Sequence, residues 1–262
     1  ILRSNPILQH LRSIKEPEEI ELLQKACNIT EKGVRRLLSF VKPGVWEYEI
    51  EAELMHEFLR NRSKGFAYTP IIASGENANV LHYIANNMQC KDGDVILLDV
   101  GAEYANYSSD LTRMIPVNGK FTARQKEIYN AVLDMKNFAT SLLVPGNNWY
   151  DYHKECGEFY TSKFLELGLL DKADVQNQDK NWPAYKKYMM HGTSHHLGLD
   201  THDYGILKDK FVENMVFTVE PGIYLPAEGF GVRIEDDMVI QNSGPAFNLM
   251  KNIPIEVEEI EE

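Results

Sequence analysis

One order of elements occurs twice along the chain, and this repeat limits the folds that the chain can adopt. A helical pattern covers residues 17–42 and ends at Pro43-Gly44, and a second helix is expected over residues 47–62. An extended region and two strand-like stretches near residues 94–117 follow.

The same order returns in the second half of the chain. A capping box, Thr122-Ala-Arg-Gln125, predicts a helix to about residue 144, and Pro145-Gly146 stands 102 residues after the first Pro-Gly pair. A helix over about residues 151–167 and strand-like stretches near residues 215–240 complete the order. The repeat therefore predicts two similar α+β halves around a shared sheet, with the functional site where they meet.

The composition excludes several classes of function. Asp and Glu exceed Lys and Arg by 39 to 27, giving 262 residues a net charge of −12, which argues against a nucleic-acid partner. No apolar run approaches the ~20 residues of a membrane span, and no secretion signal is visible. Three cysteines without CxxC spacing favour the cytoplasm. The acidic stretch over residues 250–262 is expected to be a solvated tail.

Two acidic residues interrupt apolar strand patterns in the first half. Asp99 directly continues the apolar run Val95–Leu98, and Asp110 follows after a short polar stretch. If the chain folds back near Tyr104-Ala105, the two aspartates become directly opposed, with Cβ atoms ~4.5–5.5 Å apart. Ionised carboxylates at that spacing repel each other unless a cation lies between them.

The second half contains a similar pair. Glu220 and Glu235 lie in strand-like segments, and a turn near Ala227-Glu228 would place them opposite each other. Arg233 shares a strand face with Glu235. A single acid of this kind is most often an exposed strand residue, but two opposed pairs in apolar strands need a cation.

Histidines are concentrated in one short segment. Residues 191–203 contain His191, His195, His196 and His202 among glycines and small residues, which is typical of a polar site with close backbone approach. On spacing alone, His82 reads as a satisfied core histidine. Four carboxylates and one imidazole form a ligand set for two divalent ions such as Mn²⁺, Co²⁺, Fe²⁺ or Zn²⁺, and this favours hydrolase chemistry.

Together these motifs resemble the pita-bread metallopeptidases, a family that includes methionine aminopeptidase, prolidase and aminopeptidase P. The resemblance covers essentially the whole chain and implies two pseudo-symmetric halves around a curved antiparallel sheet. The histidine motif and the Gly-Val-Arg-Ile-Glu-Asp-Asp segment that ends at residue 237 look most like aminopeptidase P and prolidase. Members of these two groups carry an N-terminal domain, so we expect residues 1–262 to be a single catalytic domain of a longer parent.

The resemblance implies roles for nine residues. Two divalent ions, Mn²⁺ first among them, are bound by Asp99, Asp110, His195, Glu220 and Glu235, with Asp110 and Glu235 shared by both ions. Glu220 also acts as general base and then acid towards a metal-activated water. The resemblance makes His82 a proton-handling residue of the substrate site, places His191 and His202 beside the scissile bond, and assigns Arg233 to support of the ligands or the substrate.

The implied substrates are peptides with proline at position two, cut after the first residue. Prolidase, which cleaves Xaa-Pro dipeptides, is the alternative enzyme, and a non-catalytic peptide-binding module on the same scaffold is the alternative from another class. The complete ligand set favours an enzyme. A homo-oligomer stays open, because its contacts would depend in part on the missing N-terminal domain.

Overall fold

The computed structural model describes residues 4–262 and contains the repeated order of elements. Both long helix pairs occur where the repeat predicts them, and a helix that was not expected precedes the first pair. The helices are α1 (Asn5–Ser13), α2 (Pro17–Phe40), α3 (Glu47–Arg60), α4 (Ala123–Ser141), α5 (Trp149–Glu166), α6 (Lys172–Gln176) and α7 (Val257–Glu261), with short 3₁₀ turns η1 (Gly75–Asn79), η2 (Ala184–Lys187) and η3 (Pro226–Glu228).

The strands form two antiparallel three-stranded sheets, one from each half, with orders β1-β2-β5 and β10-β9-β6. A bridge between Thr112 and Glu235 joins the two halves. Two short hairpins, β3-β4 and β7-β8, complete the strands. The strands are β1 (Ile71–Ser74), β2 (Val95–Val100), β3 (Glu103–Tyr104), β4 (Tyr107–Ser108), β5 (Leu111–Pro116), β6 (Val216–Val219), β7 (Gly222–Leu225), β8 (Phe230–Arg233), β9 (Asp236–Val239) and β10 (Phe247–Asn248).

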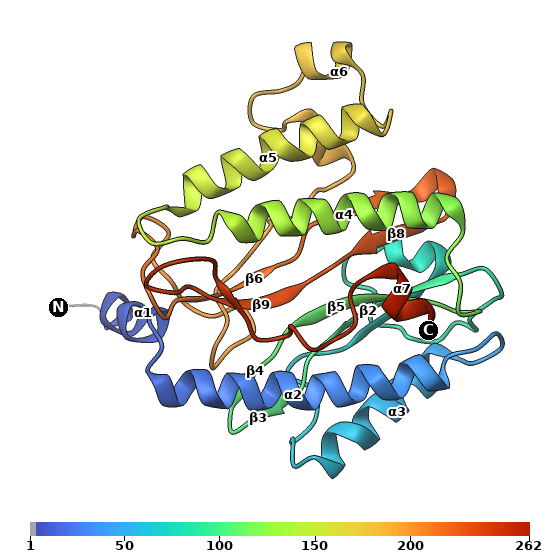
Figure 1. Ribbon diagram of the computed structural model, residues 1–262, viewed down its shortest axis with the longest axis horizontal. Helices are drawn as coiled ribbons and strands as arrows, with labels where there is room; N and C mark the ends of the chain where they lie inside the picture. The colour runs from blue at the N-terminus through green and yellow to red at the C-terminus, as the bar shows by residue number, and fades with distance from the viewer. Residues whose placement is uncertain (1–3) are drawn as a thin grey trace.

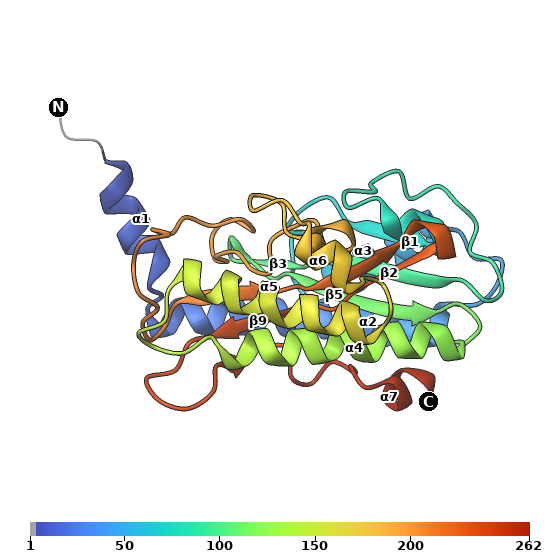
Figure 2. The ribbon, with the colours of Figure 1, turned by 90° about the horizontal axis from the view of Figure 1, so that it is seen from above.

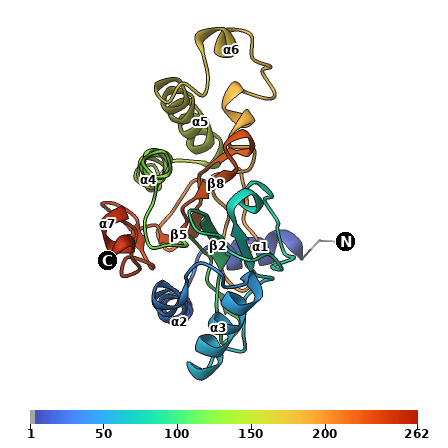
Figure 3. The ribbon, with the colours of Figure 1, turned by 90° about the vertical axis from the view of Figure 1, so that its right-hand side faces the viewer.

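The helices cover one side of the strands and leave the other side to loops. Figure 1 shows α2 and α4 running in front of the strands, and Figure 2 shows both helices on one side, with the loops between α3 and β2 on the other. Viewed from the end in Figure 3, α3 lies at one outer edge, and α5 with α6 beyond it lies at the other. The α4 side chains Ile128, Val132 and Met135 are fully buried, so an apolar helical stripe faces the strands.

The capping box is formed as predicted. Thr122 accepts a hydrogen bond from the Gln125 backbone N–H at 3.2 Å, and Gln125 Oε1 accepts one from the Thr122 backbone N–H at 2.8 Å. These bonds satisfy two backbone donors at the start of α4, which explains why the helix begins there.

The register of the first pair of strands differs from the expected one. Asp99 lies opposite Thr112, whereas we expected Asp110, because the chain turns at Ala105-Asn106, one residue later than predicted. Both turn residues have positive φ, 52° and 71°, and asparagine tolerates this conformation better than most residues. Moving the turn by one residue moves the partner of Asp99 by two residues, from Asp110 to Thr112. Because successive side chains of a strand point to opposite faces, Asp110 stays on the expected face of the hairpin.

The register of the second pair is confirmed. Gly222 pairs with Arg233 on one side of the two glutamates, and Val219 pairs with Asp236 on the other. Both ladders follow the register that sets Glu220 against Glu235, and the two glutamates lie between them. Glu220 and Glu235 therefore lie at the break between the two ladders.

The C-terminal segment is not a solvated tail, so this expectation was wrong. Val257 and Ile260 of α7 are 3% and 8% exposed and belong to the main core cluster. Glu261 accepts a hydrogen bond from the Phe121 backbone N–H at 2.8 Å. The acidic composition concealed two apolar side chains, spaced three residues apart, that form one face of a short helix.

Replacing Ile260 with alanine should lower the free energy of unfolding by ~2–4 kcal/mol, because the change leaves a cavity beneath α4. Chemical denaturation with a matched Glu258→Ala control measures the difference, since Glu258 lies in the same helix but is exposed. Equal midpoints for the two variants would restore the solvated-tail interpretation.

Among residues 4–262, none of the helices combines the length and the apolar character that a membrane crossing requires.

Candidate metal centre

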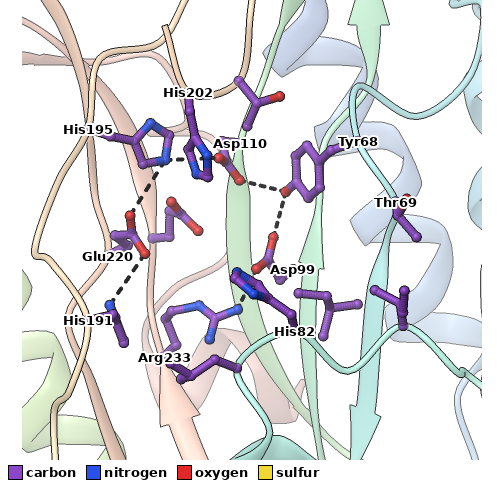
Figure 4. Close-up of a pocket in the computed structure, with 15 residues that line it drawn as sticks. Tyr68, Thr69, His82, Asp99, Asp110, His191, His195, His202, Glu220 and Arg233 are labelled. Carbon is purple, nitrogen blue, oxygen red and sulfur yellow. Dashed lines mark hydrogen bonds and ion pairs between the residues drawn. The ribbon is translucent and has the colours of Figure 1, made fainter.

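All nine residues singled out from the sequence line one cavity of about 390 Å³. Figure 4 shows their side chains converging from both halves of the chain. The cavity lining consists of Tyr68, Thr69, Ile71, Leu81, His82, Ile84, Asp99, Asp110, His191, His195, Thr201, His202, Glu220, Arg233 and Glu235.

The first half supplies two carboxylates from the ends of buried strands. Asp99 is the fifth residue of β2, whose first four side chains are buried, and Asp110 directly precedes β5. The Asp110 backbone N–H donates to Asp237 Oδ2 at 3.0 Å. This contact with the second half fixes the backbone from which the Asp110 side chain projects.

The second half supplies the other three expected ligands. Glu220 directly follows β6, Glu235 lies between β8 and β9, and His195 lies in the loop before β6. The Thr218 backbone N–H donates to the His195 carbonyl at 3.0 Å, and the Glu235 backbone N–H donates to the Thr112 carbonyl at 3.1 Å. Backbone hydrogen bonds to neighbouring strands therefore place both side chains.

The atoms expected to act as ligands come close together where the two halves meet. One atom each from Asp110, His195 and Glu235 lie within 4.8 Å of one another. His195 Nε2 lies 3.4 Å from Asp110 Oδ2 and 3.5 Å from Glu220 Oε1. Asp110, His195 and Glu235 therefore surround one point of the cavity, and Glu220 contacts His195 beside it.

Asp99 is joined to this group through other side chains. The Tyr68 hydroxyl lies 2.6 Å from an oxygen of Asp99 and 2.6 Å from an oxygen of Asp110. Arg233 forms an ion pair with Asp99 and donates to Thr112 at 3.1 Å and to the Tyr224 hydroxyl at 2.8 Å. Arg233 thus contacts Asp99, one of the expected ligands.

The three expected substrate-site histidines surround the same cavity. His82 is exposed and lines the cavity, so its reading as a core histidine was wrong. His191 Nδ1 lies 3.6 Å from Glu220 Oε2, and its Nε2 lies 2.8 Å from the Tyr224 hydroxyl. The His202 ring lies edge-on to the His195 ring, with centroids 4.3 Å apart.

The electrostatics of the cavity disfavour ionised carboxylates without a cation. Burial raises the pKa of Asp99, an effect that Arg233 opposes, and burial raises the pKa of Glu220 to about 7. The pKa of Glu235 lies well above its usual range because the group is buried and faces Asp110. Positive charge at this point would offset these penalties.

His195 shows how strongly the cavity attracts positive charge. Burial lowers its pKa, but the hydrogen bond to Asp110 and the charges of Glu220 and Asp110 outweigh burial and raise it to about 9. A divalent ion among the same groups would supply that charge and leave the imidazole as a neutral ligand. Four carboxylates and one imidazole fit Mn²⁺, Co²⁺, Fe²⁺ or Zn²⁺.

Three contributing residues were not identified from the sequence. Thr112 is two residues after Asp110, and Tyr224 is four residues after Glu220, so the alternation of strand faces could have indicated both. Tyr68 lies in an irregular segment between α3 and β1, 31 residues before Asp99, and no local pattern connects the two.

The protein-family comparison matches metallopeptidase family M24 over residues 21–242. The chain is 41% identical over 273 residues to the Xaa-Pro aminopeptidase of Haemophilus influenzae, covering 100% of the chain and 63% of that protein. It is 40% identical over 268 residues to the Xaa-Pro aminopeptidase of Escherichia coli, covering 98% of the chain and 60% of that protein. The chain thus spans less than two thirds of the length of these curated relatives.

Solved structures confirm the fold. A zinc-substituted Escherichia coli aminopeptidase P in complex with product superimposes with a TM-score of 0.91 at 38% identity, over 99% of this chain and 61% of that one. The expected pita-bread fold, with its two halves around the strands, is therefore correct. The chain belongs to metallopeptidase family M24.

Proposed function

We propose that residues 1–262 form a single catalytic domain that removes the N-terminal residue from peptides with proline at position two. The observation that carries the proposal is the cluster in which His195 lies within 3.5 Å of both Asp110 and Glu220. Glu235 belongs to the same cluster. The two Xaa-Pro aminopeptidases described above support the specificity.

In this proposal two divalent ions, with Mn²⁺ the first candidate, are held by Asp99, Asp110, His195, Glu220 and Glu235. Such ions make bound water a stronger acid and polarise a carbonyl group. The carboxylates supply oxygen ligands from both halves of the chain, and His195 supplies the nitrogen.

The other steps belong to side chains of the cavity. Glu220 accepts the proton of the attacking water and delivers it to the leaving proline nitrogen, as general base and then general acid. His191, which lies 3.6 Å from Glu220, and His202 flank the scissile bond and donate to the developing negative charge. His82 handles a proton at the exposed side of the cavity, and Arg233 keeps Asp99 in place.

The substrate is bound by its free N-terminus in this scheme. The α-amino group lies near Asp99, so internal bonds are excluded. Proline at position two presents a tertiary amide with a fixed φ and no N–H, and a dedicated site must therefore orient it.

The cellular setting follows from the same features. The net charge of −12 disfavours nucleic acid as a partner. Cys27, Cys90 and Cys156 are all unpaired and buried, which suits the reducing cytoplasm. We propose a cytoplasmic peptidase whose partners are proline-containing peptides, with a homo-oligomer as a further assembly to test by sedimentation.

After loading with Mn²⁺, the chain should cleave Xaa-Pro-Yaa tripeptides after the first residue, with the products identified by mass. Chelation should abolish cleavage and added Mn²⁺ should restore it, because the ions lower the pKa of the attacking water and polarise the scissile carbonyl. Matched Xaa-Ala-Yaa and N-acetylated Xaa-Pro-Yaa peptides are the controls. Equal cleavage of all three, or cleavage that persists without metal, would contradict the proposal.

A dipeptidase is the second candidate function. The Xaa-Pro dipeptidase of mouse is 34% identical over 304 residues, which cover 98% of this chain and 61% of that protein. Cleavage of Xaa-Pro dipeptides alone, with tripeptides left intact, would favour it. Absence of both cleavage and metal binding would favour a peptide-binding module.

A further inference from the structure

The His202 side chain is held in the cavity by its backbone. Its imidazole is exposed, and among residues 4–262 it receives no side-chain hydrogen bond. The His195 ring lies edge-on to it, with the ring centroids 4.3 Å apart, and both side chains are labelled in Figure 4. The position of the imidazole therefore depends on what holds the loop over residues 198–204.

The next residue, Asp203, ties this loop to the start of the chain. Its carboxylate lies 3.3 Å from Lys15 Nζ and 2.6 Å from Arg12 Nη2. The Lys15 and Asp203 side chains are each only 1% exposed, whereas Arg12 is 23% exposed. A buried pair of this kind is costly to separate, because either charge left alone would be unpaired in the interior.

The surrounding backbone is shaped for this pair. A Cβ atom on Gly198 would lie 2.2 Å from Asp203 Oδ2 and 3.0 Å from Lys15 Nζ, so no other residue leaves room for both groups. The Asp203 backbone N–H donates to the His196 carbonyl at 2.8 Å. The loop is thereby closed at the residue that follows His202.

Lys15 is fixed as firmly as its partner. It lies between α1 and α2, and its ammonium group also donates to the Arg12 carbonyl at 2.7 Å. Its backbone N–H donates to the Asn214 carbonyl at 2.9 Å. Both Lys15 and Asp203 are therefore held in place by further contacts, and Asp203 directly follows His202, which lines the cavity.

We infer that the buried Lys15–Asp203 ion pair, braced by Arg12, is a positioning device that holds the His202 imidazole at the scissile bond. The inference rests on the proposed function, because His202 is assigned there to the developing negative charge. If so, the junction between α1 and α2 contributes to the reaction although it lies outside the cavity. Figure 2 shows α1 projecting from the end of the molecule at which this junction lies.

The first test is kinetic. Asp203→Asn should lower kcat by roughly tenfold to a hundredfold with little change in KM, since a displaced catalytic group slows the chemical step. In a His202→Ala background the same substitution should have no further effect on kcat. Asp200→Asn is the matched control, because Asp200 lies in the same loop and pairs with Arg12 but its side chain is 58% exposed. Equal losses of kcat in both backgrounds would overturn the inference.

The second test does not depend on turnover. In Zn²⁺-loaded, ¹⁵N-histidine-labelled protein, the His202 ring signals, assigned by comparison with His202→Ala, should shift or broaden in Asp203→Asn but not in Asp200→Asn. Unchanged His202 signals would overturn the positioning role even if the wild-type chain proves inert towards every peptide. Inert wild type together with shifted His202 signals would support the positioning and reject only the peptidase proposal.

Lys15→Met covers the case in which Asp203→Asn does not fold. It leaves the Arg12–Asp203 pair in place and should give the same changes in kcat and in the His202 signals, at smaller amplitude. A Lys15→Met protein with wild-type values of both would count against the device.

Discussion

Glu235→Gln should abolish metal binding and lower peptide turnover by roughly a thousandfold or more, which corresponds to the loss of several kcal/mol of transition-state stabilisation. Glu235 is 2% exposed and shares the ligand cluster with Asp110 and His195. In the wild-type chain the Thr112 hydroxyl donates a hydrogen bond to Glu235 Oε2 at 2.7 Å. Glutamine has nearly the same shape as glutamate, and its amide oxygen can still accept this hydrogen bond. The loss would therefore be due to the missing charge.

The same substitution should stabilise the metal-free chain. The pKa of Glu235 is raised well above its usual range, so the ionised group opposes folding as the pH rises above the pKa of the unfolded chain. Glutamine removes this penalty, and the midpoint of metal-free unfolding should rise at pH 8 and change little at pH 4. Added Mn²⁺ should stabilise the wild type and leave the variant unaffected.

Glu228→Gln is the matched control for both measurements. Glu228 lies at the turn of the same hairpin, where it pairs with Arg124 at the surface. Calorimetric titration with Mn²⁺ and the tripeptide assay should give wild-type values for this variant. Metal stoichiometry and turnover at the wild-type level in Glu235→Gln would remove Glu235 from the ligand set.

Arg113→Met should lower the free energy of unfolding by ~3–5 kcal/mol, because it leaves a buried carboxylate short of a partner. Arg113 and Asp236 are 2% and 0% exposed at their side chains, and their closest atoms are 2.6 Å apart. Arg113 also donates to the carbonyls of Glu235 at 2.8 Å and Pro254 at 2.9 Å. Lys136 remains paired with Asp236 and limits the loss.

The pH dependence identifies the cause of this loss. Burial alone would raise the pKa of Asp236, but Arg113 and Lys136 hold it at about 2. A carboxyl group with a lowered pKa stabilises the fold above the pKa of the unfolded chain, and this contribution disappears as the pH falls towards 2. Urea denaturation should therefore show a difference between Arg113→Met and wild type that narrows below about pH 4.

Arg124→Met provides the surface comparison. Arg124 and its partner Glu228 are each 35% exposed, so the loss should stay below about 1 kcal/mol. A loss of similar size in both arginine variants, independent of pH, would show that side-chain volume rather than the buried charge accounts for the effect.

The sequence predicted most of the fold because its signals are local. The Pro-Gly pairs, the capping box at Thr122 and the apolar stripe of α2 each act over a few residues. The α7 segment was missed because its two apolar residues, Val257 and Ile260, are surrounded by glutamates. What covers them is α4, more than a hundred residues earlier in the chain.

The residues of the candidate site also divide into those with a local sequence signal and those without one. All nine expected side chains line the cavity. The acids in apolar strands and the clustered histidines pointed to the site from the residues alone, whereas His82 was assigned to it only by the resemblance to the pita-bread metallopeptidases. The partner of Asp99 was predicted wrongly by two positions, since the exact turn depends on how Ala105 and Asn106 accept positive φ. Tyr68 could not be found, because its contacts with Asp99 and Asp110 exist only once the chain has folded.

The two halves of the chain meet at the bridge between Thr112 and Glu235. The packing at this bridge bears on how tightly an ion can be bound. Asp99 and Asp110 belong to one half, whereas His195, Glu220 and Glu235 belong to the other. The distance between the two sets of side chains therefore depends on how the two halves pack against each other. Arg113, in the first half, donates a hydrogen bond to the Glu235 carbonyl in the second half. In the proposed metal centre, side chains that never touch an ion would therefore help to set its affinity.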